Sequence, residues 1–228
     1  RFTHKMDIKM AGWVKVKNIT QDNEMSRCQH SYICNYSNVK PYDKQGICNL
    51  TLGSWDIEAF SHSSRYNSIN EFPNPETPLD IITQIGTSLY KFGTKEKIKH
   101  VVTIKSPIDN GCDEVDGIII ETYDTETELI TGWVKFIMDT DPDILVQYNG
   151  YGFDWAYVYA RAKLLDIEYV LQNLSRIESK AAHFHETNLN TSAYGDNTMK
   201  YVKMYGVTQF DLMFLIKKDH KQLTTIRY

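Results

Sequence analysis

Apolar runs of strand length and helix length alternate along most of the chain. The first long run covers residues 50–60, and its apolar members are Leu50, Leu52, Trp55, Ile57 and Phe60. Such a run predicts a strand. Residues 143–148 predict another strand. Residues 153–165 then carry apolar and small side chains at helical spacing, which predicts a helix that follows this strand after a short turn.

Further elements lie before, between and after these two predicted strands. Residues 81–92 and 98–104 predict a hairpin, and residues 126–138 predict an amphipathic helix. Residues 61–78 are polar and contain three prolines, which predicts a long loop. Residues 1–49 alternate apolar and polar side chains in short bursts that are typical of strands. The order predicts a mixed α/β sheet with helices on its faces, preceded by a β-rich segment.

Composition sets wide limits. A chain of 228 residues with 42% hydrophobic content can bury a sizeable core and form one or two domains. We expect two, residues 1–49 and residues 50–228. No apolar run approaches membrane-spanning length and no signal pattern is present, so we expect a soluble intracellular protein without a membrane partner.

The cysteines predict reduced thiols. Cys28, Cys34, Cys48 and Cys112 lack the two close ligand pairs that zinc sites usually show, even when His30 is added as a ligand. Reduced cysteines are the default in an intracellular setting.

The charge pattern argues against DNA binding by electrostatics alone. The formal net charge is −4, and residues 1–55 hold eight Lys or Arg against four Asp or Glu. The remaining residues hold seventeen Lys or Arg against twenty-five Asp or Glu. The acidic part is therefore the part that contains the candidate site below.

Asp56 and Glu58 are the first candidate site residues. Successive side chains of a strand point to opposite faces, so these two carboxylates share one face of the predicted strand 50–60. Two carboxylates on a buried strand would repel each other unless cations lay between them, and Mg²⁺ or Mn²⁺ prefers such oxygen ligands. The alternative is an ordinary solvated Asp-x-Glu pattern near a strand end.

Asp154 is the third candidate. It falls at the start of the predicted helix 153–165, where unpaired N–H groups and the helix dipole favour a negative charge. The alternative is a simple helix cap, with Asn149 and Gly150 shaping the turn. Because both segments lie near the carboxyl ends of strands, we expect the three carboxylates to meet and to hold a pair of divalent metals.

The chain resembles family B DNA polymerases, especially the delta-type enzymes of eukaryotes and of large eukaryotic DNA viruses. Their proofreading exonuclease carries an Asp-Ile-Glu motif, present here as residues 56–58, and an Asn-x-x-x-Phe-Asp motif, present as residues 149–154. Other matching segments are Gly12–Val16, Phe72–Pro75, Asp80–Gly86, Asp141–Ile144, Gln209–Met213 and Lys218–Lys221.

The resemblance implies a fold and a chemistry. The fold is a ribonuclease-H-like exonuclease domain over residues 50–228, preceded by part of the polymerase amino-terminal domain in residues 1–49. The activity is two-metal hydrolysis of a primer 3′ end, with Mg²⁺ or Mn²⁺ held by Asp56, Glu58 and Asp154. Asn149 and Phe153 are implied as contacts to the terminal nucleotide.

One part of the family pattern is missing. The third motif, a Tyr-x-x-x-Asp pair with the fourth carboxylate, would follow Lys221, whereas the sequence stops at Tyr228. We therefore expect a piece of a longer enzyme, weak or inactive as a nuclease by itself.

The resemblance also implies partners and a location. The longer enzyme would bind DNA, use dNTPs through its polymerase domains and bind a sliding clamp. It would act in the nucleus or, if viral, in the host nucleus or a cytoplasmic replication site.

Two other functions stay open. One is a stand-alone 3′–5′ exonuclease of the same superfamily, and the other is a non-catalytic DNA-binding or scaffold module that has lost editing. Residues 194–198, Tyr-Gly-Asp-Asn-Thr, look like the catalytic motif of the polymerase palm. That motif needs a second Asp beside the first, so we interpret this stretch as a loop.

Overall fold

The computed structural model describes residues 2–9, 11–22, 24–63, 71–105, 112–191 and 195–219. The chain forms two compact units. The first comprises Arg1–Cys48 and Arg176–Lys180, and the second comprises Asn49–Ser175 and Ala181–Tyr228. The assignment of these units to two domains of a polymerase stays a prediction.

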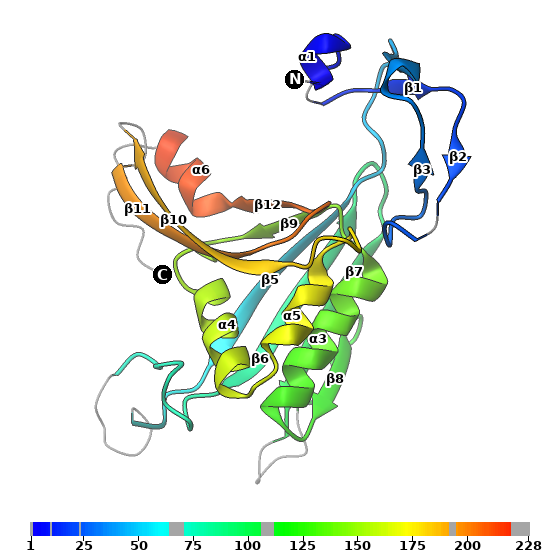
Figure 1. Cartoon of the computed structure of the whole chain (residues 1–228). Coiled ribbons are helices and arrows are strands. Elements are labelled where there is room, and N and C mark those ends of the chain that lie inside the picture. Colours follow the sequence, from blue (N-terminus) through cyan, green and yellow to red (C-terminus); the bar gives the residue numbers. More distant parts are fainter. Residues whose placement is uncertain are drawn as a thin grey trace. The chain divides into compact units, whose positions relative to one another are not determined.

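A mixed six-stranded sheet forms the centre of the second unit (Figure 1). Its strands, in spatial order, are β12 (Thr208–Asp211), β9 (Ile144–Gln147), β5 (Thr51–Ala59), β6 (Ile82–Lys91), β7 (Lys97–Ile104) and β8 (Ile119–Tyr123). β5, β6 and β7 pair antiparallel. β9 pairs parallel with β5 and with β12, and β8 pairs parallel with β7. The predicted mixed sheet is confirmed, as are the hairpin and both strands.

Helices flank this sheet. They are α3 (Glu126–Thr140), α4 (Asp154–Leu164), α5 (Glu168–Leu171), the short 3₁₀ turn η2 (Gln172–Leu174) and α6 (Leu212–Asp219). α3 begins with a capping box, in which Thr125 and Glu128 each accept a hydrogen bond from the other's backbone N–H. Figure 1 shows α3, α4 and α5 side by side along the sheet. Among the described residues, no helix combines the length and apolar character needed to cross a membrane.

Three tryptophans lie at the centre of the core. The Trp55 ring, on β5, lies 4.6 Å from Trp133 on α3 and 4.6 Å from Trp155 on α4, measured between ring centroids. None of the three side chains is more than 4% exposed. Aromatic pairs at such distances gain roughly 1 kcal/mol each beyond area burial. The cluster therefore joins the strand of Asp56 to the helix of Asp154.

A long hairpin includes residues 195–198 of the stretch 194–198 that we interpreted as a loop. β10 (His183–Thr191) pairs antiparallel with β11 (Gly195–Lys203), so the loop interpretation was wrong for these residues. The sequence concealed the strands because most of their side chains are polar, although Phe184, Tyr201 and Val202 pack in or against the core. Backbone pairing joins the two strands, and Thr198 Oγ1 donates a hydrogen bond to Asn188 Oδ1 at 2.9 Å. Tyr194 lies outside the described residues.

The first unit is built from short elements. They are α1 (Phe2–Lys5), β1 (Val14–Val16), β2 (Thr20–Gln21), β3 (Tyr32–Ile33), the 3₁₀ turn η1 (Tyr36–Asn38) and β4 (Val39–Pro41). β1 pairs with β4 and β2 pairs with β3, both antiparallel. A further bridge joins Ser26 to Ile177, which explains why Arg176–Lys180 belongs to this unit.

Cys28, Cys34, Cys48 and Cys112 are free thiols.

His100 on β7 is a buried titratable group of the second unit. Its ring is 1% exposed and stacks on Phe136 of α3 at 3.7 Å between centroids. Nε2 lies 3.3 Å from a carboxylate oxygen of Glu121 on β8. Burial lowers the pKa of His100 below 6.5, although Glu121 acts in the opposite direction. The folded chain therefore binds fewer protons here than the unfolded chain at mildly acidic pH.

We predict that His100→Gln reduces the acid sensitivity of the fold. Wild type is more stable than the variant by about 1–2 kcal/mol at about pH 7, because the ring packs well while neutral. As pH falls below 6.5, wild type loses stability by protonating a buried ring, and the difference narrows. Urea unfolding at about pH 7 and about pH 5 measures this. If the difference in unfolding free energy between wild type and His100→Gln stayed constant or widened as pH falls, the prediction would be contradicted.

Candidate active site

Asp56 and Glu58 lie on the exposed face of β5. Trp55 and Ile57 are buried, and the two acids between and after them are exposed. Residues two apart on a strand are about 6.5–7 Å apart along the chain, so their carboxylates can approach one common ion. β9 accompanies β5 only along Leu52–Ser54, and the strand therefore runs past its parallel neighbour at the acids.

Asp154, the first residue of α4, lies where β9 no longer accompanies β5. Its Oδ1 accepts a hydrogen bond of 3.3 Å from the backbone N–H of Ile57. Its side chain is also hydrogen-bonded to the Asp56 carboxyl, although the residue is only 3% exposed. The structure thus brings together two of the three predicted carboxylates. Among the residues described, no group of three or more His, Cys, Asp or Glu is arranged to hold a metal, so Glu58 is not gathered with the other two.

The Asp56–Asp154 contact changes how the site titrates. Burial first, and then the neighbouring Asp56 carboxyl, raise the pKa of Asp154 to about 7, against hydrogen bonds from backbone N–H groups that lower it. Two adjacent carboxyls cannot both be charged cheaply unless a cation neutralises them. Oxygen donors of this kind fit a hard divalent ion such as Mg²⁺ or Mn²⁺.

Asp211, which sequence reasoning missed, holds the turn before α4. Its carboxylate, 4% exposed at the end of β12, accepts the backbone N–H of Asn149 at 2.9 Å and of Tyr151 at 3.0 Å. Asn149 has a φ of 61°, and its side-chain oxygen would lie 2.4 Å from a Cβ added at Gly152. Its amide therefore packs inside the turn. The predicted contact of Asn149 to a nucleotide stays a prediction.

Phe153 and Phe72 form an aromatic pair next to the carboxylates. Phe153 directly precedes Asp154, and its ring lies 5.0 Å from Phe72 and 5.3 Å from Tyr157. Phe72 is 73% exposed. Sequence reasoning assigned Phe72 no role in the site, because a lone Phe in a polar, proline-containing loop carries no periodic signal. Its contact with Phe153 makes it a candidate surface for stacking a base.

A hollow of about 460 Å³ opens beside Asp56 on the sheet. Its polar side includes Ser54 and Ser88, and Lys99 of β7 brings a positive charge. Acidic and basic side chains thus border one concave surface.

Comparison with known proteins agrees with this geometry. Residues 1–224 match the family described as DNA polymerase family B, exonuclease domain. The chain belongs to this family. Exonuclease domains of family B polymerases are metal-dependent, which is consistent with the paired carboxylates.

The relatives found are DNA polymerases. The chain is 39% identical to a DNA polymerase of Pyramimonas orientalis virus over 142 residues, which is 62% of this chain and 11% of the relative. It is 36% identical to the DNA polymerase delta catalytic subunit of Dictyostelium discoideum over 152 residues, 66% of this chain and 13% of the relative. For the delta catalytic subunit of Oryza sativa subsp. japonica, the identity is 28% over 97% of this chain and 20% of the relative. The chain thus spans at most about a fifth of these relatives' lengths.

We predict that Asp154→Asn stabilises the metal-free protein at alkaline pH. The folded chain keeps this proton up to about pH 7 whereas the unfolded chain releases it near 3.8, so wild-type stability falls as pH rises through that window. The amide of Asp154→Asn has the same shape but no charge, so the variant avoids the cost of ionising a buried carboxyl beside Asp56. With EDTA present, the variant should gain roughly 2 kcal/mol over wild type at about pH 8 and less at about pH 5.

The control is Asp139→Asn. Asp139 lies on α3 with a side chain that is 60% exposed, next to Lys135, so its loss should change stability little at either pH. If Asp154→Asn were less stable than wild type at about pH 8, the Asp56–Asp154 contact would not destabilise the metal-free protein, which would contradict the prediction.

Proposed function

We propose that this chain is the 3′–5′ exonuclease-bearing part of a DNA polymerase, and that it hydrolyses the 3′ end of a DNA primer strand. The observation that carries the proposal is the Asp56–Asp154 carboxyl pair beside the exposed Phe72–Phe153 pair. One half of this arrangement is suited to a phosphodiester and the other half to a nucleobase. Together they match a frayed, single-stranded end.

The proposed metal site holds two Mg²⁺ or Mn²⁺ ions. Asp56 and Asp154 would be shared ligands, and Glu58 on the same strand face would supply further oxygen. When bound, such ions generate a nucleophilic water and neutralise charge on the leaving oxygen. The chain's own contribution is to fix the ligands. The tryptophan cluster holds β5 against α4, and the Ile57 N–H orients the Asp154 carboxylate.

The proposed substrate subsite is aromatic. Stacking accepts any base, so an editing site that must remove all four nucleotides gains by using it. The Phe153 ring packs against Tyr157, and its other neighbour, the Phe72 ring, is exposed to solvent. Phe72 would therefore form the outer wall of the subsite. Asn149 would act as a further contact to the terminal nucleotide from the turn before α4.

The longer enzyme would also synthesise DNA. It would use dNTPs and bind a sliding clamp through polymerase domains, and it would act inside the cell, at the nucleus or at a viral replication site. The relatives' names, DNA polymerase and DNA polymerase delta catalytic subunit, support this proposal.

We predict that Asp56→Ala or Glu58→Ala in the polymerase that carries this domain abolishes excision of a mismatched 3′ end. Loss of a metal ligand should lower the excision rate by at least about 10³-fold, because it would weaken the binding of ions that neutralise charge formed during the reaction. Primer extension on matched DNA is the control and should be unchanged. Excision at wild-type rate in either variant would remove these residues from the site.

We predict that Phe72→Ala weakens binding of the strand end. Base stacking on one aromatic side chain is worth about 1–3 kcal/mol, so KM for a single-stranded oligonucleotide should rise about 5- to 150-fold. The kcat value should stay within about threefold, since Phe72 touches no reacting atom. Phe92, an exposed aromatic of the β6–β7 turn, gives the matched control Phe92→Ala, which should leave KM unchanged. Equal KM values for Phe72→Ala and wild type would contradict the stacking role.

A further inference from the structure

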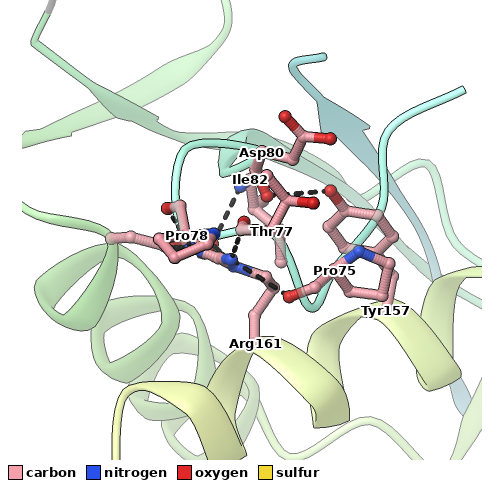
Figure 2. Close-up of polar contacts among 8 residues, drawn as sticks. Pro75, Thr77, Pro78, Asp80, Ile82, Tyr157 and Arg161 are labelled. Atoms are coloured by element: carbon pink, nitrogen blue, oxygen red, sulfur yellow. Dashed lines mark hydrogen bonds and ion pairs between the residues drawn. The ribbon is translucent and has the colours of Figure 1, made fainter. Parts of the chain in front are cut away.

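A buried arginine on α4 binds the loop that carries Phe72. Arg161 is 1% exposed, and its guanidinium donates to the backbone oxygens of Pro75 at 3.0 Å, Thr77 at 2.8 Å and Pro78 at 3.2 Å. Figure 2 shows these contacts converging on the guanidinium from one loop. A rigid fork with five N–H donors is suited to several carbonyls at once. Arg161 therefore fixes the loop backbone at three positions.

Glu126 balances this buried charge. Its carboxylate, on the first residue of α3, accepts from Arg161 Nε at 2.9 Å and from Nη2 at 2.6 Å. The same carboxylate accepts the backbone N–H of Ile82 at 2.8 Å, at the start of β6. The pair thus ties α3, α4 and β6 to the loop. Removing one partner of such a pair leaves a buried charge without compensation, whereas removing both charges is tolerated far better.

The residue before α4 and two residues within it hold the loop. Phe153 directly precedes the helix, and Tyr157 and Arg161 follow Phe153 at intervals of four residues. Phe153 contacts the Phe72 ring, and the Tyr157 hydroxyl donates to the Asp80 carbonyl at 2.9 Å. Arg161 holds the segment between these two points.

Asp80 supports the loop from inside. Its carboxylate, 4% exposed, accepts the backbone N–H of His62 at 2.9 Å and of Asn74 at 2.8 Å. The helix that begins with the candidate metal ligand Asp154 thus also sets the position of the exposed aromatic wall.

We propose that Arg161, with Glu126 and Tyr157, is a positioning device for strand-end binding. It holds the loop so that Phe72 faces the terminal base at a fixed distance from Asp56 and Asp154. This rests on the proposed exonuclease function and adds residues that touch neither substrate nor metal. Because they act only through Phe72, they should control KM and leave kcat unchanged.

The test uses the double variant Arg161→Met/Glu126→Gln in the full polymerase. It removes both buried charges and keeps an acceptor for the Ile82 N–H. KM for excision from a single-stranded oligonucleotide should rise about tenfold or more, with kcat within about threefold. Val158→Ala is the matched control. It also truncates a fully buried residue of α4, but Val158 makes none of the loop contacts, so KM should not change.

A double-mutant cycle with Phe72→Ala separates positioning from general destabilisation. If Arg161 acts through Phe72, adding Arg161→Met/Glu126→Gln to Phe72→Ala should raise KM no further. Tyr157→Phe, which removes only the bond to the Asp80 carbonyl, is the milder second variant if the charge-pair variant does not fold. It should raise KM about two- to fivefold, and only when Phe72 is present.

The outcomes distinguish the two proposals. The positioning role would be overturned if the KM effect of Arg161→Met/Glu126→Gln multiplied with that of Phe72→Ala. It would also be overturned if Val158→Ala raised KM equally. Excision by wild type and its loss in Asp56→Ala would still support the exonuclease in either case. If Asp56→Ala excises as well as wild type, the proposed function itself fails.

Discussion

The contact of Trp55 with Trp133 and Trp155 is the constraint on which the rest of the structure depends. Burying Trp55 and Ile57 on one face of β5 forces Asp56 and Glu58 onto the other face. Burying Trp155 against Trp55 sets α4 beside the same strand, with Asp154 at its first turn. The position of the acids is therefore a consequence of core packing. A fold that held these rings less tightly would also hold its candidate metal ligands less precisely in space.

The two buried charge arrangements of α4 differ in how they are satisfied. Arg161 and Glu126 meet as opposite charges with several hydrogen bonds, as a structural pair should. Asp154 and Asp56 meet as like charges, and burial raises the pKa of Asp154 to about 7. A fold retains such a conflict where a ligand resolves it, and titratable groups of this kind gather at functional sites. The Arg161–Glu126 ion pair therefore stabilises the neighbouring loop and helices. The Asp56–Asp154 carboxyl pair is the one that a bound cation would neutralise.

Much of this architecture could be predicted from the sequence, and the exceptions have physical reasons. Strands with one buried face, such as β5, and the amphipathic α3 follow from apolar periodicity. The β10–β11 hairpin did not, because most side chains of its strands are polar and show no regular apolar alternation. The contact between Asp56 and Asp154 was expected from their places near the carboxyl ends of two strands, and it occurs where β5 runs past β9. Phe72 and Asp211 were missed, since their partners lie 60 or more residues away in sequence.

The central claim is that Asp56 and Asp154 hold divalent metal at a DNA strand end. The most direct measurement is anomalous diffraction from crystals of the polymerase soaked with Mn²⁺ and a short single-stranded oligonucleotide. The account predicts Mn²⁺ about 2 Å from carboxylate oxygens of both residues, with Glu58 joining at least one ion. Full oligonucleotide occupancy with no Mn²⁺ there, and the two carboxyls still hydrogen-bonded to each other, would contradict it.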